Sequence, residues 1–359
     1  MSLRPRARIH LNHIAENWRT LQQTHQGGTV AAVVKADAYG HGLKPVCEAL
    51  HAAGCDHFFT AHAFEAEMAR KTLGPHPEIY VLNGPAAGEE DLYRQAALTP
   101  IINSQDQYRL LCEWVSAGRK LSRGYALHFD TGIHRLGLNS NDAAALAEAT
   151  QPHPPKLILS HFACADEAGA SMNSDQASLL DQVAAHFPNL PLSLSNSSGV
   201  WLDPSYHLHL SRPGLALYGG GHPPPHITLK PGLTLEAPIL QILNVPAGAS
   251  VGYGATWQAP KETLLATLAL GYGDGFPRSA SNRGFASLNG QRCPIRGRIS
   301  MDLMTIEISS MAGLARPGDY VQLIGADAPL EEQAGLAGAL GYELTTGLTP
   351  RVSRIYETD

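Results

Sequence analysis

The first ~220 residues alternate between short apolar runs and stretches with helical spacing, the pattern typical of βαβ units. No other feature of the sequence constrains the fold as strongly. Each apolar run predicts a buried strand, and each helical stretch predicts a helix that covers it. Eight such repeats predict a closed (β/α)8 barrel of the TIM type. The runs expected to form its strands are Val30–Val34, His57–Thr60, Ile79–Leu82, Thr99–Ile102, Tyr125–Phe129, Leu157–Leu159, Leu192–Leu194 and Leu208–Leu210.

Helical stretches separate most of these runs, with apolar residues three and four positions apart. The expected helices include Phe64–Leu73, Gln105–Ala117, Asp142–Ala149 and Ser174–Phe187. An open, doubly wound sheet would give a similar alternation and is the alternative fold. The sequence therefore predicts an α/β fold with a parallel sheet, and the strand count favours closure.

The pattern changes at Pro223-Pro224-Pro225, a proline-rich stretch typical of a linker. Beyond it, Asn289-Gly290 carries a hairpin signal, and only Leu330–Leu340 looks helical. A chain of 359 residues is also longer than a typical single domain. We therefore expect a barrel domain at residues 1–225 and a mostly β domain at residues 226–359.

Charge and cysteine content exclude several classes of protein. The net charge of −6 argues against nucleic acid as a main partner, since phosphate backbones attract basic surfaces. The 5 cysteines form no Cys-x-x-Cys pair, which argues against a disulfide framework or a zinc knuckle. Residues Met1–His10 lack a following apolar stretch, and no run is long enough to span a membrane. We expect a cytoplasmic protein that does not bind membranes.

Polar residues follow the predicted barrel strands, at the ends where such barrels carry their chemistry. They include a lysine, titratable or cationic partners and a hydroxyl. In chain order they are Lys35, Asn83, Asn103, Asp130, His161, Asn196, Ser197 and Arg212.

Lys35 directly follows an apolar strand, so its aliphatic stem is expected to be buried. Burial disfavours the ammonium form and lowers the pKa of a lysine, which makes the amine a nucleophile. A neutral amine can form a Schiff base with an aldehyde cofactor. The alternative is a lysine whose stem is buried while its charged end reaches solvent.

Two loops at the end of the predicted barrel suit an anionic group. Ser211–Gly220 follows the eighth strand, where Gly214 permits close approach and Leu215–Tyr218 predicts a short helix. Asn196–Gly199 follows the seventh strand and supplies hydroxyls. Barrels often bind phosphate on the backbone amides at this place, although ordinary glycine turns are the alternative.

The chain resembles the alanine racemase family over nearly its whole length, because matching motifs occur in the same order. The family's opening helix resembles Ala7–Asn17. The other matching segments are Val33–Gly42 (VVKADAYGHG), Phe129–Gly137, Ser160–Ala163, Ser195–Ser197, Ser211–Gly214, Val251–Trp257, Gly271–Gly275 and Gly297–Asp302.

The resemblance implies racemisation of L- and D-alanine with pyridoxal phosphate, which supplies D-alanine for peptidoglycan. Lys35 would carry the cofactor and act as one of two bases. Tyr253 would be the other base, reaching in from the partner subunit of a homodimer. A base on each face of Cα can remove a proton and return one without turning the substrate. The side-chain preference stays open between alanine, serine and a broader range.

The resemblance also implies the roles of the residues around these two bases. Arg135 and the backbone of Met301 would meet the substrate carboxylate. His161 would orient Tyr253, and Arg212 would face the pyridine nitrogen. The residues expected to hold the phosphate are Tyr39, Ser197, Gly214 and Leu215.

Two positions depart from the family pattern. Many members have a lysine, often modified to a carbamate that supports the arginine, where this chain has His128. Arg135 would then need another partner, such as a bound anion. Some members have a tyrosine where this chain has Pro350, so one phosphate contact would be missing.

Three other functions are alternatives to racemisation. A metal-dependent hydrolase would use His207 and His209, but no carboxylate cluster accompanies them, so we expect no metal and a packing role. Glu65 and Glu67 are interpreted as an exposed helix face. Amino-acid decarboxylases of similar fold also bind pyridoxal phosphate, but they match the lysine segment less well and lack a match to Val251–Trp257. A cofactor-binding protein without activity would not need the second domain.

Overall fold

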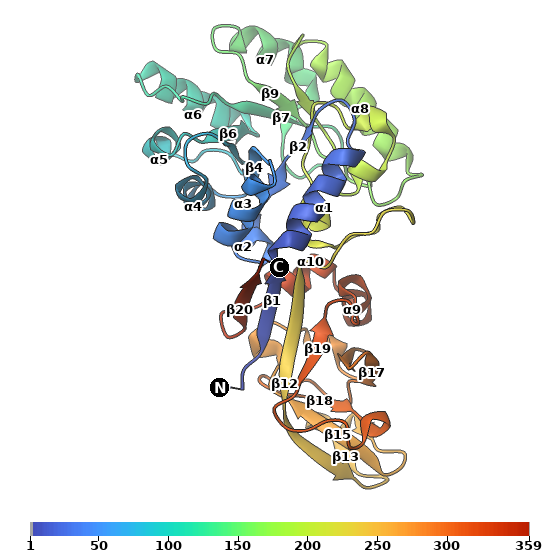
Figure 1. The fold of residues 1–359 in the computed structure, drawn as a ribbon. Helices are drawn as coiled ribbons and strands as arrows, with labels where there is room; N and C mark the ends of the chain where they lie inside the picture. The colour runs from blue at the N-terminus through green and yellow to red at the C-terminus, as the bar shows by residue number, and fades with distance from the viewer. Residues whose placement is uncertain (1–2, 359) are drawn as a thin grey trace. The chain divides into compact units, whose positions relative to one another are not determined.

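The computed structural model describes residues 3–358, which form two compact units (Figure 1). The barrel unit comprises residues 14–217 and 221–229. The β unit comprises residues 3–13, 218–220 and 230–358. Within the described chain, no helix combines the length and the apolar composition needed to cross a membrane.

The barrel unit is built on a parallel sheet in the order β3-β4-β5-β6-β7-β9-β10. Its strands begin and end within a few residues of the predicted runs. A short strand, β8 (Leu138–Asn139), pairs with β7 outside this order. The bounds are β3 (Ala32–Val33), β4 (His57–Thr60), β5 (Glu78–Val81), β6 (Thr99–Ile102), β7 (Ala126–Asp130), β9 (Leu157–Leu159) and β10 (Leu192–Ser193).

Hydrogen bonds between the first and last strands close the barrel. β2 (Thr29–Val30) precedes β3 by one residue and pairs in parallel with β11 (Leu210–Ser211). The His209 N–H donates to the Leu192 carbonyl at 3.1 Å, which joins β11 to β10. The (β/α)8 prediction is confirmed, and the open-sheet alternative is excluded, because an open sheet leaves its two edge strands unpaired.

Helices follow the strands, as the periodicity predicts (Figure 1). The four helices named from the sequence form within three residues of their predicted ends. Their apolar faces supply buried residues such as Leu111 and Leu146. The bounds are α1 (Leu11–Thr24), α3 (Leu43–Ala52), α4 (Ala63–Leu73), α5 (Glu90–Gln95), α6 (Gln105–Ser116), α7 (Ala143–Thr150) and α8 (Ser171–Ala184).

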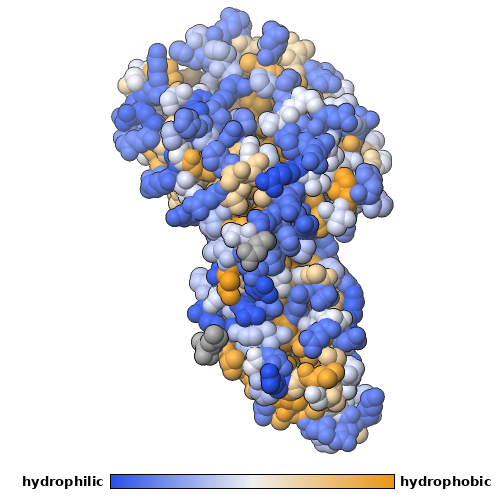
Figure 2. All heavy atoms as spheres, in the orientation of Figure 1, coloured by the Kyte–Doolittle hydropathy of each residue, from blue (hydrophilic) through white to orange (hydrophobic). Residues whose placement is uncertain are grey.

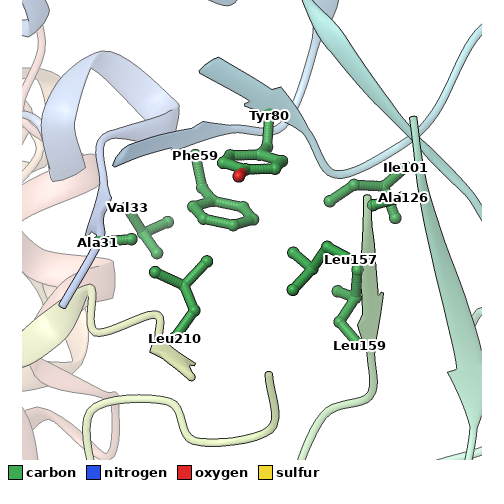
Figure 3. Close-up of a cluster of buried hydrophobic side chains, with 9 residues drawn as sticks. All are labelled: Ala31, Val33, Phe59, Tyr80, Ile101, Ala126, Leu157, Leu159 and Leu210. Atoms are coloured by element: carbon green, nitrogen blue, oxygen red, sulfur yellow. The ribbon is translucent and has the colours of Figure 1, made fainter. Parts of the chain in front are cut away.

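Apolar side chains from seven of the strands meet inside the barrel (Figure 3). The rings of Phe59 and Tyr80 stack with their centroids 4.3 Å apart. Leu157 and Leu159 lie two residues apart on β9 and both face this cluster, as the period of a strand requires. The interior is therefore a packed core, and functional groups are confined to the ends of the strands.

The β unit contains the first strand of the chain as well as the C-terminal region. β1 (Arg6–His10) pairs antiparallel with β12 (Leu233–Val245) and parallel with β20 (Ser353–Glu357). Residues 6–10 are therefore a strand, and the opening helix begins only at Leu11. This division differs from the predicted domain at residues 1–225, because Ala7 and Ile9 are buried in the β unit.

The hairpin predicted at Asn289-Gly290 joins β16 to β17, and both residues have positive φ, of 50° and 78°. The structure adds a second helix to the one that was predicted in this region. The remaining elements of the β unit are β13 (Ser250–Val251), β14 (Trp257–Gln258), β15 (Thr263–Leu268), β16 (Phe285–Leu288), β17 (Gln291–Pro294), β18 (Met304–Glu307), β19 (Tyr320–Ile324), α9 (Leu330–Ala337) and α10 (Gly341–Thr346).

Phe59→Ala should lower the free energy of unfolding by about 3–5 kcal/mol, because it leaves a cavity in the barrel core. Phe64→Ala is the matched control, since Phe64 lies on α4 with 60% of its surface exposed. The control should change the free energy by less than about 0.5 kcal/mol. Urea denaturation measures both, and equal effects would contradict the burial of Phe59 in the barrel core.

Candidate active site

Lys35 begins α2 (Lys35–Tyr39), which is a left-handed turn. Ala36, Asp37, Ala38 and Tyr39 have φ angles of 53°, 54°, 52° and 55°. Residues with a Cβ rarely adopt this conformation, and each costs about 1–2 kcal/mol. Such strain persists only where surrounding contacts hold it, and it is common at functional sites.

The surroundings of Lys35 favour the neutral amine. Burial lowers the pKa of Lys35, and the nearby Arg135 guanidinium lowers it further. The Glu65 carboxylate acts in the opposite direction and raises it. The direction of the net shift agrees with the expectation for a lysine at the end of a buried strand.

Glu65 is buried, with 8% of its surface exposed, so its assignment to an exposed helix face is wrong. Its carboxylate accepts hydrogen bonds from the N–H groups of Ala36 at 2.7 Å, Ala61 at 2.9 Å and His62 at 3.1 Å. Glu67, by contrast, pairs with Lys71 on the outside of the same helix. The sequence does carry a signal for Glu65, because a glutamate three residues after a helix N-cap is typical of a capping box.

Arg212 follows β11 and is almost fully buried, with 5% of its surface exposed. Its guanidinium donates to the Ser193 hydroxyl and to the carbonyls of Ser160 at 2.5 Å and Leu194 at 3.4 Å. Burial lowers the pKa of Arg212 to about 10, so the group stays charged at neutral pH. The barrel thus holds a fixed cation at the carboxyl ends of its strands.

His161 lies beside Arg212 and is neutral. Burial lowers the pKa of His161 well below its usual value, and the charges of Arg212 and Arg135 lower it further. An Arg212 N–H faces the His161 Nδ1 atom at 3.5 Å, so Nδ1 is the acceptor and Nε2 carries the proton. Gln176 of α8 donates to the His161 carbonyl at 2.9 Å and fixes this residue.

His128 occupies the position where many family members have a lysine. Asn103 donates to the Leu82 and Ile101 carbonyls, so its oxygen faces His128 Nδ1 at 2.8 Å, and Nδ1 must carry the proton. Burial lowers the pKa of His128 to about 4, with a further contribution from Arg212. A neutral imidazole therefore replaces a lysine here.

Arg135 lies in the exposed loop between β7 and β8. Asp130 organises this loop by accepting from the Gly132 N–H at 2.9 Å and from the His134 N–H at 3.1 Å. Burial alone would raise the pKa of Asp130, but these bonds and His134 outweigh it, and the net pKa is lowered. The loop is therefore ordered around a carboxylate, with Arg135 next to His134 on its outside.

The residues expected to hold a phosphate come together at the end of the barrel. The Ser197 hydroxyl accepts from the N–H groups of Gly214 at 3.0 Å and Ala216 at 3.1 Å. The Tyr39 phenol lies so close to Gly214 that a Cβ there would fall 2.2 Å from its oxygen. Leu215 begins a short 3-10 helix, as predicted, directly after Gly214. The backbone amides at the start of this helix therefore lie next to Gly214. The site thus combines a hydroxyl, backbone amides and a phenol around a glycine that has no room for a side chain. Such a set of groups fits a phosphate.

The three family motifs of the second domain also come together, within the β unit. A Cβ on Gly254, next to Tyr253, would fall 2.7 Å from the Arg298 side chain. The Gly273 N–H donates to the Met301 carbonyl at 2.8 Å. Tyr253 and Met301 are 72% and 53% exposed, so both side chains are accessible in the single chain.

The two candidate metal ligands, His207 and His209, each accept a hydrogen bond from a backbone amide. His207 accepts from the Gln26 N–H at 2.8 Å and stacks on His25, while His209 accepts from the Leu192 N–H at 3.1 Å. Across residues 3–358, no three His, Cys, Asp or Glu side chains are grouped to hold a metal ion.

Comparisons with known proteins cover both units. The family model described as "Alanine racemase, N-terminal domain" matches residues 9–222, and that for the C-terminal domain matches residues 232–356. The alanine racemase of Methylobacterium sp. (strain 4-46) is 42% identical over 98% of this chain and 97% of its own length. A catabolic alanine racemase of Agrobacterium fabrum is 41% identical over 97% of this chain and 91% of its own length.

The solved structure of alanine racemase from Bartonella henselae, with covalently bound pyridoxal phosphate, is similar in fold. It superposes with a TM-score of 0.92 at 33% identity, over 99% of this chain and all of its own.

Gly214→Ala should weaken the binding of pyridoxal phosphate about tenfold or more, because the added Cβ would displace the Tyr39 phenol. Gly169→Ala is the control, since a Cβ at Gly169 meets open space. Absorption titration of the cofactor into each variant measures the affinity. Equal affinities in the two variants would show that the segment around Gly214 does not hold the cofactor.

Proposed function

The chain belongs to the alanine racemase family, and from this premise we propose that Lys35 and Tyr253 are the two bases that interconvert L-alanine and D-alanine. The protein is a pyridoxal-phosphate-dependent isomerase. The cofactor, when bound, makes the α-proton of the amino acid acidic by drawing electrons into its ring. The rest of the mechanism follows from what the side chains do.

The observation that carries the proposal is the environment of Lys35. Burial and the Arg135 charge favour its neutral amine, which is the form that can bind an aldehyde and accept a proton. The left-handed turn holds its backbone in one conformation. A lysine that only reached solvent would need neither feature.

The Ser197–Gly214–Tyr39 cradle, with Leu215, is the proposed phosphate site. Arg212 is the group proposed to face the pyridine nitrogen. With a pKa of about 10 it keeps its proton at neutral pH, so it presents a fixed positive charge there. That charge would disfavour a proton on the pyridine nitrogen, so the cofactor would withdraw electrons less strongly and side reactions such as transamination would be limited.

Tyr253 would receive or return the proton on the face of Cα opposite Lys35. His161 would orient the phenol, because its Nε2–H is available as a donor. Arg135 and the backbone of Met301 would bind the substrate carboxylate, Arg135 through its charge. These groups bind and orient, whereas only the two bases move a proton.

We further propose a homodimer in which Tyr253 enters the site of the other subunit. The high exposure of Tyr253 supports this, as do exposed apolar residues elsewhere in the β unit, such as Leu240 and Leu243 of β12. Hydrophobic residues are visible on the surface of this unit in Figure 2. Exposed apolar surface of this kind often marks a subunit interface.

The cellular role is also a proposal: the enzyme acts in the cytoplasm and supplies D-alanine for peptidoglycan. Its cysteines are unpaired, which suits a reducing compartment. Expression in a bacterium that lacks its own alanine racemases tests the role. Growth without added D-alanine supports supply, and continued dependence on D-alanine contradicts it.

Lys35→Ala should abolish racemisation and remove the visible absorption band of the bound cofactor, because the variant lacks the amine proposed to bind the aldehyde. Lys71→Ala, which changes an exposed lysine on α4, should keep both. Absorption spectra and an assay of D-alanine formed from L-alanine check the outcome. A Lys35→Ala protein that keeps the absorption band would contradict the assignment of Lys35 as the residue that binds the cofactor.

Tyr253→Phe should lower racemisation by about 10²–10⁴-fold, the usual contribution of a general base. The cofactor band should stay, because Lys35 is unchanged. Tyr342→Phe, on α10 of the same unit, is the control. Racemisation that survives Tyr253→Phe with little loss would rule out the two-base proposal.

Mixing the two inactive variants tests whether the site crosses between subunits. A hybrid of Lys35→Ala and Tyr253→Phe chains would contain one intact site and one doubly altered site. Random exchange of subunits should restore about a quarter of the wild-type activity, since half the dimers are hybrids. If both residues serve the site of their own chain, mixing will restore nothing.

A further inference from the structure

We propose that Glu65 is a positioning residue for Lys35, because its carboxylate clamps the left-handed turn on which the lysine is carried. The inference rests on the proposed function, in which Lys35 binds the cofactor and moves a proton. It adds a residue from α4 that contacts the backbone next to Lys35 and acts only through it.

The two carboxylate oxygens of Glu65 serve different segments. Oε2 accepts from the N–H groups of Ala61 and His62, which completes the N-terminus of its own helix, α4. Oε1 accepts from the Ala36 N–H at 2.7 Å, in a segment 29 residues away in sequence. A capping role needs only the first set of bonds. The bond to Ala36 ties α4 to the residue that follows Lys35.

Ala36 is the place where such a bond has the most effect. It is the first of four successive residues with φ near 50°, none of which is a glycine. The N–H groups in the first turn of a helix have no acceptor within that turn, so Ala36 depends on an outside group. The next residue, Asp37, lies in the strained segment itself, and its carboxylate accepts from the Leu43 N–H at 2.7 Å. One carboxylate from α4 and one from the turn itself therefore hold the strained segment.

The negative charge of Glu65 also affects the pKa of the Lys35 amine. Burial and Arg135 lower the pKa of Lys35, and Glu65 opposes them. His161 also interacts with Lys35, and it is neutral because its own pKa is lowered well below the usual value. Loss of the Glu65 charge should therefore lower the pKa of Lys35, since burial and Arg135 would continue to act and the opposing carboxylate would be gone.

The test compares Glu65→Gln and Glu65→Asp with the matched control Glu67→Gln. Gln keeps the shape and an acceptor oxygen but removes the charge. Asp keeps the charge on a shorter side chain that cannot reach both segments. Glu67 lies two residues away on the exposed side of α4 and pairs with Lys71.

Two measurements are made on the full chain freed of cofactor. Trace acetylation with acetic anhydride across a pH series, read by mass spectrometry of the Lys35 peptide, gives the pH midpoint of the amine. Amide hydrogen exchange of the peptide covering residues 35–42 reports how firmly the turn is held. Neither readout depends on catalysis.

Glu65→Gln should lower the Lys35 midpoint by about one pH unit, because an opposite charge is lost. It should also speed exchange in residues 35–42 by about tenfold, because a charged acceptor becomes a neutral one. Glu65→Asp should keep the midpoint near that of the wild type but speed exchange. Glu67→Gln should change neither quantity.

Glu65 would be only a helix cap if Glu65→Gln lowered the melting temperature but matched Glu67→Gln in both measurements. If Glu65→Gln does not fold, Glu65→Asp decides alone, and unchanged exchange in residues 35–42 overturns the proposal. A wild-type chain that failed to bind pyridoxal phosphate at Lys35 would contradict the proposed function instead. These measurements separate the two failures, since they are made without cofactor.

Discussion

The pairing of β2 with β11 is the contact on which the candidate site depends. The Ala31 N–H donates to the Ser211 carbonyl at 2.9 Å, and the Val33 N–H donates to the Pro213 carbonyl at 3.0 Å. These bonds bring the start of the barrel beside its end, so the segment after β3 meets the segment after β11. The Tyr39 phenol can lie on Gly214 only because the barrel is closed in this register. An open sheet made of the same strands would place Lys35 and Arg212 at opposite edges.

Burial at this end of the barrel then fixes the protonation state of each group. The same desolvation acts on Lys35, His128, His161 and Arg212, but with different results because their intrinsic pKa values differ. The two histidines become neutral and can each present a defined tautomer. Arg212 stays charged, because its lowered pKa of about 10 is still well above neutral pH. Lys35 lies between these cases, and Glu65 and Arg135 act on it in opposite directions. The site thus separates a fixed cation from a titratable amine without a metal ligand cluster among the described residues.

Local patterns in the sequence were enough to predict the order of elements and much of the fold. The barrel strands were found because each is a short apolar run between helical stretches, and the β16–β17 hairpin because Asn-Gly favours positive φ. The N-terminal strand was missed because its partners, β12 and β20, lie more than 200 residues away in sequence. The pattern of a segment of five residues is too short to distinguish a strand from the start of a helix. The exposed assignment of Glu65 failed for a related reason, since its buried acceptor role depends on Ala36 from another strand–helix unit.

The amino-acid sequence was sufficient to identify the chemical groups at the ends of the barrel strands, and its ordered motifs identified the family. It also placed Gly214 and Leu215–Tyr218 where a phosphate cradle would lie. The left-handed turn after Lys35 could not be predicted from local sequence, because four residues with side chains adopt it at a cost that long-range hydrogen bonds offset. Only the tertiary structure set the direction of each pKa shift, because desolvation and charge depend on neighbours that the chain brings together from distant positions. Residue type and local spacing are properties of short segments, whereas burial, register and strain arise when the barrel closes.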